Sequence, residues 1–307
     1  MVHSDMLQFI IGQMLEPVPL PSEDLTGQTI ALGPWRYEMN VSHLILACRS
    51  PEKGETARQE ILASSRLSSP GKVYVWQLDM AEHSSVLAFG KRINNLTRLD
   101  SFIANAGIDA AQFVRAEGHE STLTVNVIST LLVAMLVISR LRESSKELGK
   151  PSHLVFTGSV VHVNAKHSHL CKPKQGQMFK NLDDENMADM ANRYPLSKLV
   201  LLLGFRKLAE EISRSEPEPG QTSVISNFVH PGYCKTDLFK SNDGGIGGRL
   251  LLLLSVDLLK RVVEHWCMEL WLTKQPTGNI WPNIQERLWP ELVDILDGIQ
   301  PGVTKLE

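Results

Sequence analysis

The feature that most restricts the fold of this chain is a set of short apolar segments that alternate with longer segments of helical pattern. The clearest apolar segment, Leu-Ile-Leu-Ala-Cys at residues 44–48, is apolar at every position instead of at every second position. A strand of this kind is buried on both faces, as in a parallel sheet that helices cover from two sides.

The same kind of pattern predicts further strands at residues 29–32, 72–78, 99–104, 153–157, 223–229 and 278–281. Helices are predicted at residues 51–64, 84–94, 119–144, 194–213 and 249–272. The alternation indicates βαβ units. We therefore expect an α/β fold with a doubly wound parallel sheet of the Rossmann-like kind, which binds ligands at the carboxyl ends of its strands.

Two parts of the chain are expected to differ in organisation. Residues 1–24 are interpreted as an N-terminal arm, in which Pro17, Pro19 and Pro21 favour extended chain. Residues 25–307 contain no internal repeat and no linker-like composition. We expect them to form a single domain.

Composition restricts the classes of partner. The net charge is −3, which gives no indication of a nucleic-acid or anionic-membrane partner. The four cysteines are scattered without a Cys-x-x-Cys pair, which favours a reducing compartment, and we expect a cytoplasmic protein. No membrane span is expected, because Asp257 interrupts the longest apolar run, residues 250–259. No metal site is expected either, and His162, His167 and His169 are interpreted as solvated.

A candidate catalytic pair stands at the head of the predicted helix 194–213. Tyr194 and Lys198 are four residues apart, so the phenol and the ammonium point the same way. Pro195 suits the first turn of such a helix. A nearby cation favours the phenolate, so we expect Lys198 to lower the pKa of Tyr194 from about 10 towards neutral pH. The alternative interpretation is an ordinary helix start with a surface lysine.

Small or hydrogen-bonding residues follow the predicted strands, at the edge where this fold binds ligands. They are Arg49 with Ser50 and Lys53, Asp79, Asn105-Ala106-Gly107, Gly158-Ser159, and His230-Pro231-Gly232 with Thr236. Taken one at a time, these residues also fit plain turns or solvated charges.

In combination, these residues resemble the short-chain dehydrogenase/reductase family over about residues 25–300. The resemblance is carried by Asn105-Ala106-Gly107, Asn126 in the following helix, Ser159, Tyr194 with Lys198, and Pro231-Gly232 with Thr236. The arm and the Leu-rich C-terminal part resemble fungal members of the family that serve natural-product pathways.

The resemblance implies a catalytic set of Ser159, Tyr194, Lys198 and Asn126. Tyr194 would donate a proton to a carbonyl oxygen as hydride reaches the carbon, or accept one in the reverse direction. Lys198 would hold the nicotinamide ribose, and Ser159 would hydrogen-bond the substrate oxygen. Asn126 would fix a water that links Lys198 to solvent, although it could also be a polar break in an amphipathic helix.

The resemblance also implies a nucleotide cofactor, and Arg49, where an NAD enzyme would carry an acid, points to NADP. The residues expected to bind it are Arg49, Lys53, Asp79, Asn105, Ala106, Gly107, Tyr194, Lys198, Pro231, Gly232 and Thr236. The expected substrate is a small organic molecule in a pocket shaped by residues 162–192 and 237–275. Family members often pair through helices around Asn126 and Tyr194, which implies a homodimer or homotetramer.

One part of the family pattern is missing, so that the first βα unit is truncated. The family carries Thr-Gly-x-x-x-Gly-x-Gly and a helix after its first strand, whereas here Gly33 is the single glycine among the ten residues between Leu32 and His43. A parallel crossover usually takes a dozen or more residues. The missing loop is the usual seat of the cofactor diphosphate. We expect residues 1–20 or 33–42 to cover the flank of the sheet that the helix would cover.

Three interpretations of the missing loop remain open. The chain is a reductase that has lost a segment, a redox-neutral relative that performs isomerisation, dehydration or cyclisation, or an inactive protein that binds a pathway partner. An intact Ser159, Tyr194 and Lys198 set argues against the third, and the absent loop argues against the first. Because most of the chain follows the reductase pattern, we rank an oxidoreductase first, with NADP-linked carbonyl reduction or alcohol oxidation.

Overall fold

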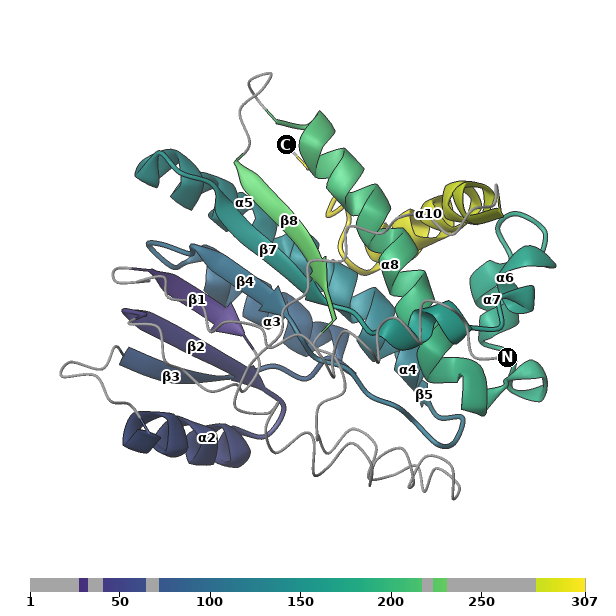
Figure 1. Cartoon of the computed structure of the whole chain (residues 1–307), viewed down its shortest axis with the longest axis horizontal. Helices are drawn as coiled ribbons and strands as arrows, with labels where there is room; N and C mark the ends of the chain where they lie inside the picture. The colour runs from purple at the N-terminus through teal and green to yellow at the C-terminus, as the bar shows by residue number, and fades with distance from the viewer. Residues whose placement is uncertain (1–27, 33–40, 65–71, 217–222, 231–279, 307) are drawn as a thin grey trace, which may run out of the picture.

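A six-stranded sheet forms the centre of the molecule (Figure 1). The computed structural model describes residues 28–32, 41–64, 72–216, 223–230 and 280–306. The strands of the sheet are β1 Thr29–Leu32, β2 His43–Cys48, β3 Lys72–Gln77, β4 Ser101–Ala104, β7 Ser152–Thr157 and β8 Val224–Val229. They pair in parallel in the order β3-β2-β1-β4-β7-β8. The order changes direction between β1 and β4, as in a doubly wound sheet, so the predicted fold class is confirmed.

Helices and a small hairpin connect the strands. The longer helices are α2 Pro51–Ser64, α3 His83–Asn94, α5 Thr130–Leu148, α8 Met190–Arg214 and α10 Ile280–Ile299. The shorter elements are the hairpin β5 Arg115–Ala116 and β6 His119–Glu120, the helical turns α4 Ser121–Leu123, η1 Thr124–Ser129, η2 Val160–Asn164 and η3 Glu185–Met187, and the helices α6 Ser168–Cys171 and α7 Met178–Leu182.

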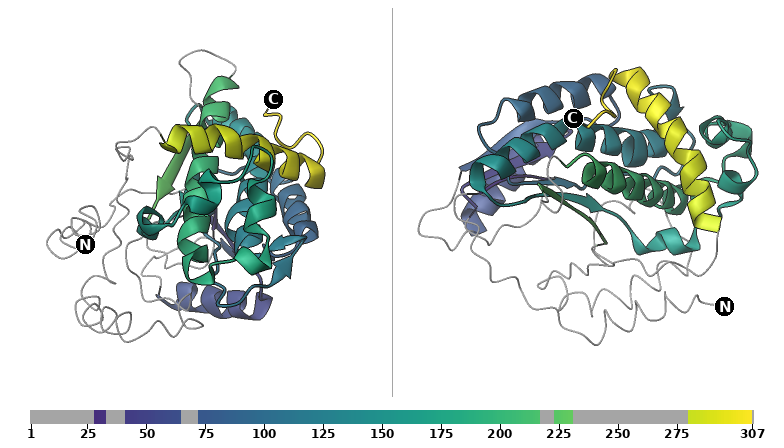
Figure 2. Two further views of the ribbon diagram at one scale, coloured as in Figure 1. Left: turned by 90° about the vertical axis from the view of Figure 1, so that its right-hand side faces the viewer. Right: turned by 90° about the horizontal axis from the view of Figure 1, so that it is seen from above.

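Apolar side chains pack on both faces of the sheet, and β2 shows how. Leu44 and Leu46 pack in a small core with Ile61 of α2. Ile45, which points to the opposite face, belongs to a large core built with α3, α5, α8 and α10. Figure 2 shows α10, in yellow, against α8, in green. The continuous apolar pattern of β2 follows from its burial on both faces.

The most apolar helical segment of the described chain, Ser121–Leu148, lies inside this large core. It is long and apolar enough to cross a membrane, but 89% of its most apolar window is buried within the protein. Its α5 part packs on β4 and β7. Its apolar residues therefore serve the core.

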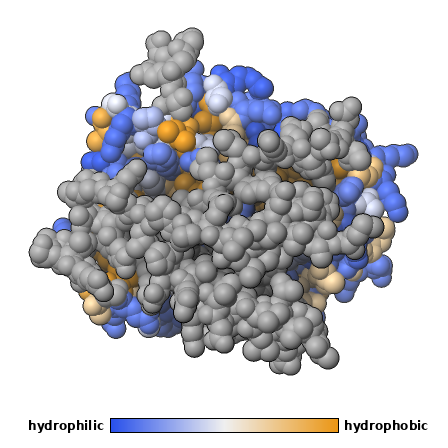
Figure 3. Space-filling model, in the orientation of Figure 1, coloured by the Kyte–Doolittle hydropathy of each residue, from blue (hydrophilic) through white to orange (hydrophobic). Residues whose placement is uncertain are grey.

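One face of the molecule shows the character of part of the described surface. In the view of Figure 3, hydrophilic residues make up most of the coloured rim, with small apolar areas between them. The large apolar side chains exposed in the described part of the chain are Tyr74, Val114 and Met187, and they are far apart in the sequence.

The truncated first unit still supports parallel pairing. Thr29 pairs with His43 and Leu32 with Leu46, although ten residues connect β1 to β2. An extended chain of this length reaches about 33 Å, well beyond the roughly 13 Å length of a four-residue strand. Asp100 also holds β1, because its carboxylate accepts a hydrogen bond of 2.8 Å from the backbone N–H of Thr29.

Three sequence predictions are corrected by the structure. The strand expected at residues 278–281 is wrong for residues 280 and 281, which the structure describes, because α10 begins at Ile280 and buries apolar side chains every fourth residue from Ile284 to Leu296. The helix expected from residue 119 begins after the β5–β6 hairpin, and it contains the π-helical turn η1. Helix α8 begins at Met190, so Pro195 lies in its second turn instead of its first.

The remaining expected strands occur within two residues of their predicted bounds. The N-terminal arm, the helix expected at residues 249–272, and Pro231, Gly232 and Thr236 lie outside the described residues.

Candidate active site

Tyr194 and Lys198 lie one turn apart on α8, and both side chains are buried, with 7% and 3% of their surface exposed. Lys198 Nζ lies 5.8 Å from the centre of the Tyr194 ring. The same ammonium donates a hydrogen bond of 2.9 Å to the carbonyl of Thr157, the last residue of β7. The hydrogen bond ties this part of α8 to the carboxyl end of the sheet, where the fold predicts a ligand site.

Burial controls the protonation of this pair. It raises the pKa of Tyr194 to about 12, an effect that a hydrogen bond with the side chain of Ser159 partly offsets. Burial also lowers the pKa of Lys198 to about 8. We expected Lys198 to bring the phenol pKa down, but desolvation is the larger effect here. Tyr194 therefore keeps its proton at neutral pH, and burial moves its pKa away from the range that proton transfer favours.

Ser159 follows β7 and begins the helical turn η2, where its Oγ accepts a hydrogen bond of 3.5 Å from the N–H of Val161. The preceding residue must be small. A Cβ on Gly158 would lie 2.0 Å from the ring of Phe228 on β8, so glycine lets the end of β7 pass beside that ring. This packing fixes the position of the backbone that carries Ser159, whose side chain forms a hydrogen bond with Tyr194.

Asn126 lies in the π-helical turn η1 and is fully buried. Its Oδ1 accepts a hydrogen bond of 2.8 Å from the N–H of Ile108, and its Nδ2 donates to the Ile108 carbonyl at 2.9 Å and to Ser197 Oγ at 3.0 Å. π-Helical turns often occur at functional sites. The Asn126 side chain therefore joins the loop after β4 to α8, and its expected role in holding a water stays a prediction.

The residues after β4 complete the group. Asn105, Ala106 and Gly107 follow Ala104, the last residue of that strand. A Cβ on Gly107 would lie 3.4 Å from Asn126 Oδ1 and 3.5 Å from Lys198 Nζ. Gly107 thus leaves a space beside the ammonium that a larger residue would fill.

Three other predicted residues lie towards β2 and β3. Asp79 follows β3, and its Oδ1 accepts a hydrogen bond of 2.9 Å from the N–H of Ala81. Arg49 follows β2, and Lys53 lies in the first turn of α2; both are exposed. The structure therefore brings Ser159, Tyr194, Lys198, Asn126 and Gly107 together, and it places Asp79, Arg49 and Lys53 along the part of the sheet formed by β2 and β3.

Two histidines near the site have surroundings that the sequence did not reveal. His162, interpreted as solvated, is half-buried, and its Nδ1 lies 2.6 Å from the carbonyl oxygen of Ser159. His230 directly follows β8 and is buried. Burial lowers the pKa of both imidazoles, and the proximity of His162 lowers that of His230 further. His230 stands directly after a strand, which was the available signal, whereas His162 lies within η2, five residues after the end of β7.

An ion pair was also missed. Arg193 and Glu120, exposed by 2% and 0%, approach to 3.4 Å between Nε and Oε2. The position of Arg193 directly before Tyr194 was the signal that could have drawn attention to it.

The site fits one end of a nicotinamide nucleotide better than the other. In the described part of the chain, Thr157 O is the acceptor for Lys198 Nζ, and the adjacent space at Gly107 suits a ligand that offers hydroxyl groups to the ammonium. The opposite end of the nucleotide lacks its usual seat, because the sequence between Leu32 and His43 has one glycine. The residues present thus fit the ribose next to the nicotinamide.

The chain belongs to the short-chain dehydrogenase/reductase family. A family model described as short chain dehydrogenase matches residues 35–169. The short-chain dehydrogenase anuD of Penicillium roqueforti is 39% identical, over 97% of this chain and 84% of the relative. The short chain dehydrogenase/reductase dmxR8 of Cryptosporiopsis sp. is 30% identical, over 96% of this chain and 98% of the relative. The resemblance to fungal members is thereby confirmed.

The comparison with anuD also shows a difference in length. The alignment extends over 329 positions, more than the 307 residues of this chain. The relative therefore has internal residues that this chain lacks.

Solved structures agree on the fold. A putative uncharacterized protein from Mycobacterium Paratuberculosis superposes with a TM-score of 0.57 at 19% identity, over 91% of this chain and 96% of that one. RhlG of Pseudomonas aeruginosa, solved with NADP in its active site, superposes with a TM-score of 0.51 at 16% identity, over 92% of this chain and 93% of that one. At these identities the likeness concerns the fold alone.

Proposed function

We propose that the protein catalyses NADP-linked carbonyl reduction or alcohol oxidation on a small, apolar organic molecule. Membership of the short-chain dehydrogenase/reductase family supports an oxidoreductase. The observation that carries the proposal is the buried Tyr194 side chain, hydrogen-bonded to Ser159 and one turn from Lys198. Fungal relatives described as short-chain dehydrogenases support a natural-product substrate.

The proposed chemistry uses these side chains as a proton-transfer set. The nicotinamide, when bound, supplies or accepts the hydride. In reduction, Tyr194 gives its phenolic proton to the carbonyl oxygen, and the Ser159 hydroxyl hydrogen-bonds the same oxygen and stabilises its developing charge. The Lys198 ammonium then lies beside the phenolate that remains. Reduction uses the neutral phenol, which is the form that Tyr194 holds at neutral pH.

Preference for NADP is the finer part of the proposal. Arg49 follows β2 at the position where a 2′-phosphate would lie, and Lys53 is four residues further on. An arginine pairs well with a phosphate because its planar guanidinium offers several parallel donors.

Two measurements test the proposed function. Titration of NADPH and NADH into the purified protein, followed by fluorescence and by melting temperature, should show tighter binding of NADPH. Tyr194→Phe should lower turnover by about 100-fold or more without lowering the melting temperature. Full turnover of Tyr194→Phe would refute the assignment.

The truncated first unit favours a second candidate function. Ten residues with one glycine replace the usual diphosphate seat, so the same acid–base set would serve a redox-neutral isomerisation, dehydration or cyclisation. This reaction would convert substrate with no change in the absorbance of added NADPH. A reductase would consume NADPH in step with product.

We also propose a cytoplasmic protein that assembles as a homodimer or homotetramer. Light scattering of the purified protein measures the assembly, and a mass near 34.3 kDa would exclude it.

A further inference from the structure

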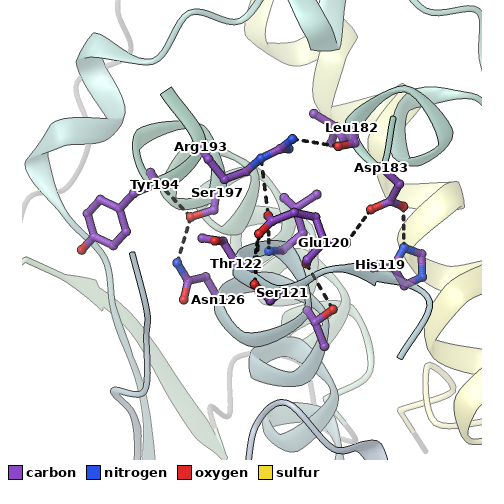
Figure 4. A network of polar contacts seen from close by, with 12 residues as sticks. His119, Glu120, Ser121, Thr122, Asn126, Leu182, Asp183, Arg193, Tyr194 and Ser197 are labelled. Carbon is purple, nitrogen blue, oxygen red and sulfur yellow. Dashed lines mark hydrogen bonds and ion pairs between the residues drawn. The ribbon is translucent and has the colours of Figure 1, made fainter. Parts of the chain in front are cut away.

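A buried ion pair joins the two helical segments that carry Tyr194 and Asn126 (Figure 4). Arg193 directly precedes Tyr194 on α8, and Glu120 directly precedes α4. Their charged groups lie 3.4 Å apart, and neither side chain is more than 2% exposed. A pair this deep in the protein meets little solvent screening.

Glu120 controls the start of the helix that leads to Asn126. Its carboxylate accepts hydrogen bonds from the N–H groups of Thr122 at 2.8 Å and Leu123 at 3.3 Å. A carboxylate at this position satisfies N–H groups that have no partner within the helix and complements the helix dipole. Glu120 therefore fixes the first turn, from which the chain passes into the π-helical turn with Asn126.

Arg193 links α8 to a third segment of the chain. Its Nη2 donates a hydrogen bond of 2.8 Å to the carbonyl of Leu182, the last residue of α7. The next residue, Asp183, accepts a hydrogen bond of 2.8 Å from the N–H of Glu120, and its carboxylate contacts His119 Nδ1 at 2.7 Å. The ion pair and the end of α7 thus form one connected network.

A second, uncharged link joins the same two segments on the other side of Tyr194. Asn126 Nδ2 donates to Ser197 Oγ at 3.0 Å, and Ser197 Oγ donates to the carbonyl of Tyr194 at 2.8 Å. Tyr194 is therefore held between two connections, one at the residue before it and one at its own carbonyl. Figure 4 shows both connections with the phenol beside them.

The ion pair is not arranged for greatest stability. Arg193 Nε and Nη1 are buried and form no hydrogen bond within the described part of the chain. Burying two charges costs desolvation energy that a single contact rarely recovers, so such pairs often add little net stability. We propose that Glu120 and Arg193 are positioning residues, which hold the Tyr194 hydroxyl and the Asn126 amide in the relative placement that the proposed reaction needs.

The inference rests on the proposed function, and its first test is kinetic. Arg193→Met and Glu120→Gln should each lower kcat by about 100-fold, the effect of misplacing a reacting group by about 1 Å, with a smaller change in KM. The double variant should lose no more than the worse single variant, because the pair acts as a unit.

A matched control separates positioning from loss of a buried charge. Arg140 is also buried, at 7% exposed, and pairs with Glu143 at 2.8 Å and Glu147 at 3.1 Å along α5. Arg140→Met should lower the melting temperature and leave kcat unchanged. If Arg193→Met fails to fold, Arg193→Lys and Glu120→Gln carry the test, since each retains a polar group at its position.

A second readout does not depend on turnover. The phenol of Tyr194 can be titrated by ultraviolet difference absorbance against Tyr194→Phe. Its pKa depends on its burial and on its hydrogen bond with Ser159, so a changed titration in the variants would report that the hydroxyl has moved. Unchanged titration and unchanged kcat in Arg193→Met and Glu120→Gln would overturn the proposal. Failure of the proposed function shows differently, as full turnover in Tyr194→Phe, and the titration still reports on the pair.

Discussion

Replacing Lys198 by methionine should change how the stability of the protein depends on pH. Burial lowers the pKa of Lys198 to about 8 in the folded protein, whereas an unfolded lysine has a pKa near 10.4. The difference corresponds to about 3 kcal/mol of unfavourable burial while the group is charged. Between these two values the unfolded state binds more protons than the folded state, so this contribution to stability rises with pH.

At pH 7 two effects of the substitution oppose each other. Methionine removes the buried charge, which favours folding by about 3 kcal/mol. It also removes the hydrogen bond to the Thr157 carbonyl and leaves that acceptor without this donor, at a cost of about 1–3 kcal/mol. We therefore expect Lys198→Met to be as stable as the wild type at pH 7, or more stable.

The pH dependence gives the sharper test. Urea unfolding can be followed by tryptophan fluorescence from pH 7 to 10.5 for both proteins. Over this range, the free energy of unfolding of the wild type should rise by up to about 3 kcal/mol relative to that of the variant. A constant difference from pH 7 to 10.5 would refute the reasoning.

Lys207, on the same helix, is the control for this experiment. A hydrogen bond to Glu286 and another to Glu210 raise the pKa of Lys207. A lysine whose pKa is raised by folding stabilises the fold at every pH below its pKa in the unfolded chain. This stabilisation is lost only as the pH rises through the pKa of the lysine in the folded protein. Lys207→Met should therefore show a constant difference from wild type between pH 8 and 10.

Three further predictions concern packing and the first strand. Gly158→Ala should destabilise the protein by about 1–3 kcal/mol, because the added Cβ meets the ring of Phe228. Gly298→Ala on α10 should stabilise the protein by up to about 1 kcal/mol, because the added Cβ meets nothing within 4 Å. The urea midpoints of the two variants test this difference. Leu292→Ala should cost about 2–5 kcal/mol in thermal unfolding, since this side chain of α10 is fully buried. Asp100→Ala should cost about 1–3 kcal/mol, because it removes the acceptor for the first N–H of β1, and hydrogen exchange should rise first in that strand.

The sheet could be predicted from local pattern because each strand is short, apolar and bounded by turns. Residues 44–48 illustrate this, since burial on both faces of β2 leaves no polar position. The predictions that failed also have a physical reason. Four residues at 278–281 resemble a strand, but the four-residue spacing of the buried side chains from Ile284 to Leu296 decides for a helix.

The candidate site was only partly predictable for a different reason. Spacing alone placed Tyr194 and Lys198 on one face of α8, because i and i+4 are neighbours on any helix. Their pKa values depend on burial by segments far away in the sequence, which spacing does not report. The partnership of Glu120 with Arg193 bridges 73 residues, so it required the fold.

The truncated first unit removes a structural element of the cofactor site, not one that the described sheet requires. β1 pairs with β2 on one side and β4 on the other, and Asp100 holds its first residue, so the strand keeps its place with a ten-residue connection to β2. The group around Tyr194 is built from β7, α8 and η1, none of which depends on that connection. The loss should therefore weaken binding of the nucleotide diphosphate and leave the proton-transfer group intact. The dinucleotide should then owe its advantage over a nicotinamide mononucleotide mainly to the end where Arg49 lies, so Arg49→Ala should reduce that advantage, whereas an unchanged advantage in this variant would show that other residues have replaced the missing seat.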